Sequence, residues 1–417
     1  MPVYRSGVLR SLANIAWGMV IVVDEHGTTR VGVGEPVATV RVHDADAFYR
    51  AVALGEGDIG LGESYVDGAW DTDAIATLML VLVGNSARIT GGAALGTHKT
   101  GASDLRTDAS AVQHHYDAGN EFYETFLTDR LMAYTCGFFL CPSDTLDQAQ
   151  HNKVERLIAK MDAQPGDAVL DIGCGWGRIA AYVAERTGTI VTGTSVAHEQ
   201  LRYIRENVPS VRGAFCHHMD MGARMREGGL LPSGKSAFDR AYSIGMFEHV
   251  RCRNYDLFFA NVAAVLRPGG RLVLHTISTN RDDTRCDSGA TRIFVTKHIF
   301  PEGQIPKVEW VMQAAARNGF DLLHLETLAG SHYARTLRHW RQNMMAARER
   351  TLARGWATDR LVRAYEYYFA SCEAAFENNQ MQLSHFVFTK RGADAPPVHA
   401  QEAELGGFLC GRGAATP

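Results

Sequence analysis

A single strand, glycine turn and helix near the middle of the chain constrains the fold more than any other segment. Residues Ala168–Ile172 are predicted to form a buried strand that runs directly into Gly173, Gly175 and Gly177, with a helix following through Arg186. Glycine lets the backbone approach a ligand closely, and the N-terminus of a helix presents free N–H groups. The segment therefore predicts a ligand-binding turn, the alternative being a glycine-rich turn without a ligand. Its spacing is GxGxG, not the GxGxxG that seats a dinucleotide pyrophosphate.

The chain after Asp104 alternates between strands and helices, which favours a doubly wound α/β fold with a mostly parallel sheet. Further strands are predicted at 189–194, 211–216, 239–244 and 271–277, with helices at 198–207 and 254–266. The last strand, 382–389, follows long helices, and we predict that it runs antiparallel at the end of the sheet.

The first hundred residues have a different character and predict a smaller α+β domain. Strands are expected at 20–23 and 37–42, a helix at 45–54, and an apolar helix after Trp70. A segment rich in Gly, Ser and Thr, 84–103, is expected to be a linker. We therefore divide the chain into residues 1–100, a second domain at 101–392, and a tail at 393–417 that is predicted to be disordered.

Composition excludes several classes of protein. With 42 basic and 46 acidic residues the formal net charge is −4, so no nucleic-acid partner is expected. The apolar stretches at 12–23 and 74–83 are too short to span a bilayer. Eight cysteines without paired spacing predict free thiols in a reducing compartment, and no metal site is expected.

A series of further motifs, each in a fixed order along the chain, narrows the family. They are GLGESYVDG at 60–68 with Trp70, HYDAGNEFY at 115–123, MAYTCGFF at 132–139, SIGMFEHV at 243–250, HTI at 275–277, HIFP at 298–301 and SHYARTL at 331–337. Together with the glycine turn, they resemble the cyclopropane-fatty-acyl-phospholipid synthases over about residues 45–390. Because the N-terminal block is present, the chain resembles the longer bacterial phospholipid enzymes more than the shorter mycolic acid cyclopropane synthases.

The resemblance implies a Rossmann-like class I S-adenosylmethionine-dependent methyltransferase sheet, mostly parallel with an antiparallel last strand. It implies transfer of a methyl(ene) group from S-adenosylmethionine to the cis double bond of unsaturated acyl chains in membrane phospholipids. The ring then closes through a carbocation that a bound bicarbonate deprotonates. The matching bicarbonate ligands are Cys136, Glu248, His275, Tyr333 and the backbone of Ile277.

These residue types suit the implied chemistry. Thiol, imidazole and phenol groups donate hydrogen bonds to an oxyanion, and a carboxylate accepts one from its hydroxyl. Aromatic rings near the motifs are candidates to stabilise a carbocation or to wall an acyl channel: Tyr116, Phe122, Tyr123, Tyr134, Phe138, Phe139 and Phe247. Each residue taken singly also has the ordinary interpretation of core packing.

The expected contacts of S-adenosylmethionine follow the same resemblance. Asp171, Gly173, Gly175 and Gly177 form the glycine turn, and Tyr134 and Thr135 are expected beside the methionine moiety. The second strand lacks the usual terminal acidic residue, so the ribose hydroxyls are assigned to Thr194, Ser195 and Gln200. Asp220 is a candidate for the adenine edge, with a solvated loop aspartate as the alternative.

The expected partners are a phospholipid bilayer surface and a second copy of the chain in a homodimer. The N-terminal domain is expected to associate with lipid, and the enzyme to lie in the cytoplasm, peripherally on the inner face of the cell membrane. The HIFP motif continues with Glu302 where the family has glycine, and 280–291 is unusually polar, so the acyl chain and headgroup stay open. Three alternatives also stay open: a methyl-branched or methylene product, a non-catalytic lipid-binding protein, and a small-molecule methyltransferase.

Overall fold

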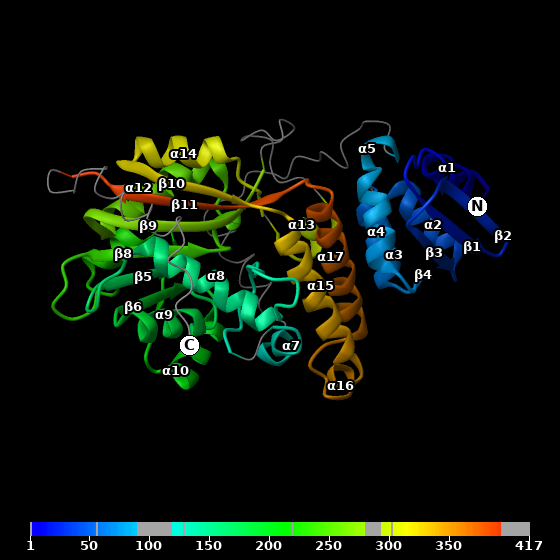
Figure 1. Cartoon of the computed structure of the whole chain (residues 1–417). Helices are drawn as coiled ribbons and strands as arrows, with labels where there is room; N and C mark the ends of the chain where they lie inside the picture. Colours follow the sequence, from blue (N-terminus) through cyan, green and yellow to red (C-terminus); the bar gives the residue numbers. More distant parts are fainter. Residues whose placement is uncertain are drawn as a thin grey trace.

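The large sheet of the computed structural model has seven strands in the order β10-β11-β9-β8-β5-β6-β7 (Figure 1). The structure describes residues 2–55, 57–89, 119–127, 130–218, 220–279, 293–301 and 303–392. The strands are β5 (Ala168–Ile172), β6 (Ile190–Ser195), β7 (Arg212–Phe215), β8 (Phe238–Ile244), β9 (Leu266–Ser278), β10 (Phe320–Leu328) and β11 (Gln382–Lys390). Strands β5 to β9 pair in parallel, which confirms the predicted α/β class and the Rossmann-like arrangement.

The predicted antiparallel last strand is confirmed, but its predicted place at the end of the sheet is wrong. Strand β11 lies between β9 and β10 and runs antiparallel to both. The strand at this edge of the sheet is β10, which the sequence did not predict. Its side chains are mostly half-exposed and include Asp321, His324 and Glu326, so it lacks the apolar run of a buried strand.

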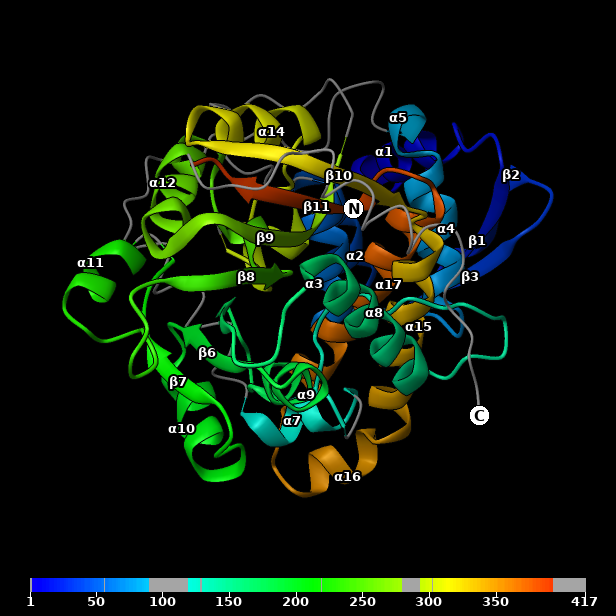
Figure 2. The same cartoon turned by 60° about the vertical axis from the view of Figure 1, so that its left-hand side comes forward.

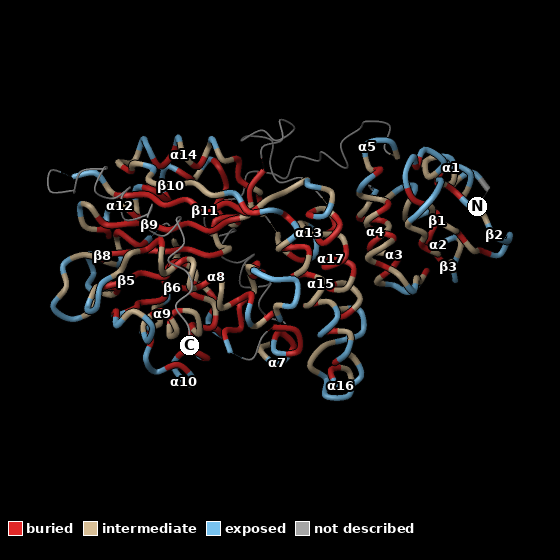
Figure 3. Tube along the Cα trace, viewed as in Figure 1, coloured by how far each residue is buried: buried red, intermediate tan, exposed pale blue. Residues whose placement is uncertain are grey.

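Helices cover both faces of this sheet, as Figure 2 shows. One face carries α8 (Leu146–Met161), α9 (Arg178–Thr187) and α10 (His198–Asn207), which pack on alternate side chains such as Val169 and Val273. The other carries α12 (Tyr255–Val265) and α14 (Val308–Arg317), which pack on Leu170 and Leu272. Because side chains alternate along a strand, the central strands are buried on both faces (Figure 3). The short helix α11 (Met221–Arg226) follows β7.

The N-terminal part of the chain forms a second, four-stranded sheet in the order β2-β1-β3-β4. Its elements are α1 (Pro2–Leu12), β1 (Gly18–Asp24), β2 (Gly27–Val33), β3 (Val37–Val42), α2 (Ala45–Leu54), α3 (Asp58–Val66), β4 (Trp70–Asp71), α4 (Ile75–Gly84) and α5 (Ser86–Ile89). The sequence predicted β1, β3 and α2 but missed β2, an edge strand with largely exposed side chains. The predicted linker begins with α5, and its remainder from residue 90 lies outside the described residues.

Helix α3 contains two glycines, Gly60 and Gly62, that permit close packing. A Cβ atom on Gly60 would lie 1.9 Å from the carbonyl oxygen of Ala51, in helix α2. A Cβ on Gly62 would lie 2.3 Å from the ring of Phe294. Only glycine therefore allows α3 to contact both α2 and Phe294.

The N-terminal sheet and its helices pack against α17 (Asp359–Glu377) and α13 (Phe294–His298), as Figure 1 shows for α17. The hydroxyl of Tyr65 donates to Glu366 Oε2 at 2.7 Å, and Arg363 Nε donates to the carbonyl of Tyr65 at 2.7 Å. Asp58 accepts a hydrogen bond from the backbone N–H of Phe294 at 3.0 Å. Helices α7 (Asn120–Glu124), α15 (Ser331–Ala346) and α16 (Arg348–Ala353) complete the described part of the chain.

The prediction of free thiols holds at most of the described cysteines but not at all of them. Cys136, Cys141, Cys174, Cys216 and Cys372 are free. Cys252 is disulfide-bonded, so the prediction is wrong there. The predicted disordered tail, 393–417, lies outside the described residues, as do the polar segment 280–291 and Tyr116.

The contact at Asp58 generates a prediction about stability. Burial raises the pKa of Asp58 to about 6, above its ordinary value of 3.8. Because the folded state binds this proton more tightly, its contribution to stability falls as the pH rises from 4 to 6. We expect Asp58→Asn, which keeps the acceptor for Phe294, to raise the free energy of unfolding at pH 8 by about 1 kcal/mol. Thermal unfolding at pH 5 and pH 8 measures this, with the exposed Glu25→Gln as control. A lower melting temperature for Asp58→Asn at pH 8 would contradict it.

Candidate active site

The glycine turn after β5 forms one wall of a pocket at the carboxyl end of the sheet. We call this the cofactor pocket; it has a volume of about 120 Å³. Its walls are the segments 131–135, 171–179, 194–196, 216–218 and 244–246, with Gln200 and His249. Gly175 adopts φ +53°, and a Cβ on it would meet no atom within 4 Å. The backbone at Gly175 therefore leaves open space that a ligand fills, next to the start of α9.

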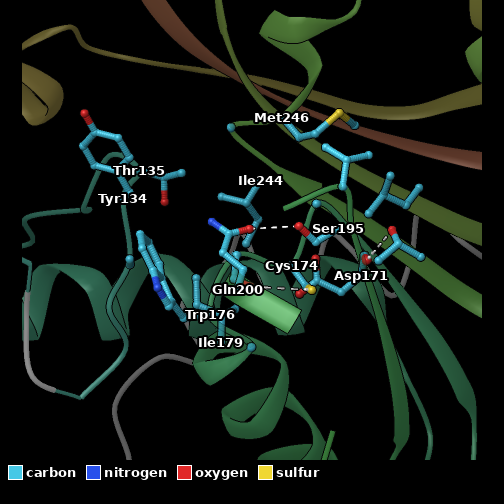
Figure 4. Close-up of a pocket in the computed structure, with 18 of the residues that line it drawn as sticks. Tyr134, Thr135, Asp171, Cys174, Trp176, Ile179, Ser195, Gln200, Ile244 and Met246 are labelled. Atoms are coloured by element: carbon cyan, nitrogen blue, oxygen red, sulfur yellow. Dashed lines mark hydrogen bonds between the residues drawn. The ribbon is translucent and has the colours of Figure 1, made fainter. Parts of the chain in front are cut away.

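Polar groups in the cofactor pocket are held by a few internal hydrogen bonds. Ser195 Oγ donates to Gln200 Oε1 at 2.9 Å, and these two side chains face each other in Figure 4. The remaining amide N–H groups of Gln200 are then the donors for a ligand hydroxyl. The hydroxyl of Thr194 donates to the carbonyl of Asp171 at 3.2 Å. This hydroxyl therefore stabilises the sheet more than it contributes to the pocket.

The carboxyl group of Asp171 is nearly inaccessible and ties β5 to β8. It accepts a hydrogen bond from the hydroxyl of Tyr242 at 2.8 Å. Burial raises the pKa of Asp171 to about 7. If Asp171 is protonated, or shares a proton with a neighbour, its carboxyl group can be buried beneath the glycine turn without an ion partner.

Asp220 does not reach the cofactor pocket, which corrects its assignment to the adenine edge. It is exposed and precedes α11, whereas the wall next to β7 consists of Cys216, His217 and His218. His218 Nε2 is buried without a hydrogen-bond partner among the described residues. In the sequence, the signal for this wall was the histidine pair His217 and His218, directly after the strand predicted at 211–216.

A second, larger cavity adjoins the cofactor pocket. We call this the reaction cavity; it has a volume of about 710 Å³ and is lined mainly by apolar side chains. One end of it brings together all five residues assigned to the bicarbonate, which come from separate elements: Cys136, Glu248, His275, Ile277 and Tyr333. They lie in the loop before α8, the short helix η1 (Phe247–His249), strand β9 and helix α15.

Glu248 is fixed by the backbone of β9. Its Oε1 accepts a hydrogen bond from the N–H of Ile277 at 2.6 Å, while Oε2 is buried and has no hydrogen-bond partner among the described residues. Burial raises the pKa of Glu248 to about 7. The amide N–H of Ile277 therefore orients Glu248.

The other members of the set are neutral donors. Burial raises the pKa of the Cys136 thiol to about 12, and its Sγ donates to the carbonyl of Gly137 at 3.2 Å. Burial also raises the pKa of Tyr333 well above its ordinary value and lowers that of His275 well below. An uncharged thiol, phenol and imidazole next to the unpaired Glu248 Oε2 fit a small oxyanion that carries both acceptors and one hydroxyl donor.

The two cavities meet at a narrow junction. Tyr134, Thr135, Gly245 and His249 line both of them. Gly245 adopts φ +64°, and a Cβ there would lie 2.5 Å from Thr135 Cγ2, so only glycine lets these segments touch. Gln150 Nε2 donates to the carbonyl of Thr135 at 2.8 Å. Thr135 therefore lies between the cofactor pocket and the reaction cavity.

A buried lysine beneath the junction was missed in the sequence. Lys153 Nζ donates to Thr135 Oγ1 at 2.7 Å. Burial lowers the pKa of Lys153 to about 7, while Cys136 and Asp171 oppose this shift. Its position four residues before Leu157 and eight before Met161 places it on the buried face of α8, but its charge favoured an exposed position in the sequence.

Most aromatic residues near the motifs pack in the core and do not line the reaction cavity. Phe122 is fully buried, with its ring 4.9 Å from that of Tyr365 in an edge-on contact. Tyr123, Phe138, Phe139 and Phe247 are likewise absent from the lining, which corrects the cation-stabilising assignment for them. Tyr134 does line the cavity, together with Phe300, Tyr368 and Phe376, which the sequence did not single out.

The reaction cavity continues into the N-terminal part of the chain. There it is lined by side chains from the second sheet and its helices: Val20, Val22, Val40, Phe48, Val52, Leu78 and Met79. The remote end thus lies between strands β1 and β3 and helices α2 and α4. Both sheets contribute walls to one apolar space.

The chain is similar to known proteins over most of its length. The model of the family described as "Mycolic acid cyclopropane synthetase" matches residues 103–386. A "Cyclopropane-fatty-acyl-phospholipid synthase" from Escherichia coli is 31% identical over 377 residues, covering 87% of this chain and 91% of the relative. A "Probable fatty acid methyltransferase" from Pseudomonas putida is 33% identical over 291 residues, covering 70% of this chain and 72% of the relative.

Solved structures show the same similarity over about two thirds of the chain. The cyclopropane synthase MmaA2 from Mycobacterium tuberculosis is 28% identical with a TM-score of 0.60, covering 69% of this chain and 100% of that one. The mycolic acid cyclopropane synthase CmaA1, complexed with SAH and CTAB, is 26% identical with a TM-score of 0.59, covering 68% of this chain and 98% of that one.

The open space at Gly175 gives a test of the cofactor pocket. In Gly175→Val the new side chain enters the pocket and strains a positive φ, so affinity for S-adenosylmethionine should fall at least about tenfold. Gly166 is the matched control, because it has φ +83°, open space around its Cβ and an exposed position outside the pocket. Calorimetry should show loss of binding for Gly175→Val and normal binding for Gly166→Val. Normal affinity in a folded Gly175→Val protein would overturn the pocket assignment.

Proposed function

The chain belongs to the mycolic acid cyclopropane synthetase family of S-adenosylmethionine-dependent methyltransferases, and we propose that it forms cyclopropane rings in membrane lipids. It transfers a methylene group to the cis double bond of unsaturated acyl chains in phospholipids. The observation that carries this proposal is the junction at Tyr134, Thr135 and Gly245, which joins a cofactor pocket to a long apolar cavity.

Two small molecules fit the site that the structure provides. S-adenosylmethionine supplies an electrophilic methyl group, and bicarbonate supplies a base next to the acyl chain. The open space at Gly175 supports the first, as does the SAH complex of the related CmaA1. The unpaired Glu248 Oε2, surrounded by neutral donors, supports the second.

The residues of the chain have distinct roles in this proposal. Thr135 and Tyr134 hold the reacting sulfonium at the junction, with Thr135 itself fixed by Gln150 and Lys153. Cys136, Tyr333 and His275 donate hydrogen bonds to the anion, and Glu248 Oε2 accepts from its hydroxyl. The neutral state of Cys136 also keeps its sulfur a poor nucleophile, since the thiolate is the reactive form.

The acyl chain occupies the reaction cavity beyond the junction. Apolar walls exclude water from the double bond, which protects a cationic intermediate from hydration. The N-terminal end of the cavity then holds one end of the chain, between β1, β3, α2 and α4. This gives the N-terminal part a direct role in binding substrate as well as its proposed role at the membrane.

We further propose that the enzyme works at the surface of a phospholipid bilayer, on the inner face of the cell membrane, as a homodimer. In the described ranges, no helix has the length and hydropathy needed to cross a bilayer. Trp17, Leu54 and Val3 are exposed apolar side chains on the N-terminal part, 46%, 59% and 79% accessible, and each is a candidate for contact with lipid.

A second product is supported by one observation. Two relatives from different organisms carry the name "Probable fatty acid methyltransferase", at 33% and 34% identity. Loss of a different proton from the same intermediate gives a methyl-branched or methylene chain. The residues at the junction do not distinguish these products, because all of them begin with the same methyl transfer.

Substitution of the anion site tests the proposed base. Cys136→Ser and Glu248→Gln should bind S-adenosylmethionine almost normally, yet lose turnover by at least about tenfold. The serine hydroxyl lies farther from the anion because a C–O bond is shorter than a C–S bond, and glutamine replaces one carboxylate acceptor by an amide donor. Excess bicarbonate should partly restore Cys136→Ser. Cys141→Ser, at an exposed thiol five positions away, is the control. Full activity of the unaltered enzyme in bicarbonate-depleted buffer would show instead that a side chain is the base.

The remote end of the cavity predicts chain-length selectivity. Val52 lines the cavity and is half-buried, so Val52→Phe should shorten the space available to the acyl chain. On vesicles with mixed acyl lengths we expect products to shift toward shorter chains, with an unchanged KM for S-adenosylmethionine. Val33→Phe, at a 66% exposed position in strand β2 of the N-terminal sheet, is the control. Identical product distributions for both variants, measured by gas chromatography, would show that the N-terminal part is not part of the substrate site.

A further inference from the structure

His275 has a second nitrogen that turns away from the reaction cavity into the sheet. His275 in β9 lies directly opposite His385 in β11, in antiparallel register. The Nδ1 of His275 and the Nε2 of His385 are 2.6 Å apart. Both histidines are at most 2% exposed. A hydrogen bond at this distance holds one proton, so the tautomer of one imidazole determines that of the other.

A buried lysine continues this contact toward the surface. Lys160 of α8 places Nζ 2.6 Å from His385 Nδ1 and 2.5 Å from Glu326 Oε2. Glu326 also forms an ion pair with Arg156, and both of these side chains are partly exposed. A continuous series of hydrogen bonds therefore joins the floor of the reaction cavity to the surface at β10.

The polarity of this series follows from its end groups. The carboxylate of Glu326 only accepts hydrogen bonds, and an ammonium group only donates them. Lys160 therefore donates to Glu326 and to His385 Nδ1, which places the proton of His385 on Nε2. That proton is donated to His275 Nδ1, so the proton of His275 resides on Nε2.

The charges along the series depend on burial and on the neighbouring ions, and the polarity above holds for the ammonium form of Lys160. Burial, together with the neighbouring lysines, lowers the pKa of both His275 and His385 well below the ordinary value, so both rings stay neutral. Burial and Arg156 lower the pKa of Lys160 to about 6. The carboxylate of Glu326, 2.5 Å away, acts in the opposite direction and favours the ammonium form.

We propose that Lys160 and His385 are positioning residues that fix His275 in the tautomer whose Nε2–H points into the reaction cavity. In this tautomer His275 donates to a carbonate-type anion; in the other it would present a lone pair and repel one. This inference rests on the proposed function for the identity of the anion. The tautomer itself is a property of the chain alone.

Two substitutions at one position separate this role from simple packing. Glutamine at 385 offers an amide N–H for His275 Nδ1 and a carbonyl oxygen for Lys160, which reproduces the polarity. Leucine has a similar volume and offers neither. We therefore compare His385→Gln with His385→Leu, and use Lys390→Met as a control on the same strand, where Nζ donates to the carbonyls of Ala263 and Leu266 at 2.6 Å.

The test is long-range proton–nitrogen NMR of the full chain labelled with ¹⁵N-histidine, without added bicarbonate, the His275 signals being assigned by their absence in His275→Asn. We expect the Nε2–H tautomer in the unaltered protein, in His385→Gln and in Lys390→Met, and a mixture of tautomers in His385→Leu. Titration with ¹³C-bicarbonate should then show affinity weakened about tenfold in His385→Leu alone, with normal affinity for S-adenosylmethionine.

The outcomes distinguish the inference from the proposed function. An Nδ1–H tautomer in the unaltered protein, or an unchanged tautomer in folded His385→Leu, overturns the positioning role whatever the anion is. Unaltered protein that binds no bicarbonate but shows the Nε2–H tautomer contradicts the proposed base and supports the positioning role.

Discussion

The hydrogen bond between the N–H of Ile277 and Oε1 of Glu248 is the interaction on which the site depends. It holds a carboxyl group inside a largely apolar cavity, where an unpaired carboxylate is costly. The parallel pairing of β8 and β9 makes it possible, because η1 follows β8 at the edge where β9 presents Ile277. One oxygen of Glu248 is satisfied by the sheet, and the other is left for a ligand. The donors around Glu248 can bind the same ligand as this carboxyl group only because its orientation is fixed.

The site is also divided between parts of the chain that are distant in sequence. The sheet provides Glu248 and His275, the loop before α8 provides Cys136, and α15 provides Tyr333. The N-terminal sheet closes the far end of the same cavity through its contacts with α13 and α17. Large buried side chains such as Trp70 and Tyr367 stabilise that contact, since each removes a wide apolar surface from water. Folding of the two sheets and formation of the cavity are therefore coupled.

The sequence predicted those features that depend on local patterns. Strand β5, helix α2 and helix α10 begin and end where their apolar patterns do, and the glycine turn lies where a pocket forms. Edge strands β2 and β10 were missed because half-exposed strands lack an apolar run. Asp220 was misplaced because nothing local shows which way a loop turns after β7.

Buried polar residues were the hardest to predict. Lys153, Lys160 and His385 lie within ordinary helical or strand patterns, and only the packing of α8 against β9 and β11 shows that they are buried. The hydrogen bond from the N–H of Ile277 to the side chain of Glu248 was not predicted either. Such contacts join residues far apart in sequence, so no local pattern contains them.

In the proposed reaction, methyl transfer at Thr135, between the two cavities, ends in a cyclopropane ring on a phospholipid acyl chain. Its most direct measurement uses the purified full-length protein, methyl-¹³C-labelled S-adenosylmethionine, bicarbonate and vesicles of phospholipid with cis-unsaturated chains. Carbon-edited NMR of the extracted lipids should show labelled ring methylene protons in the high-field region where cyclopropanes resonate. Labelled methyl branches or olefinic methylene groups in place of the ring, or no label in the lipid, would contradict the account.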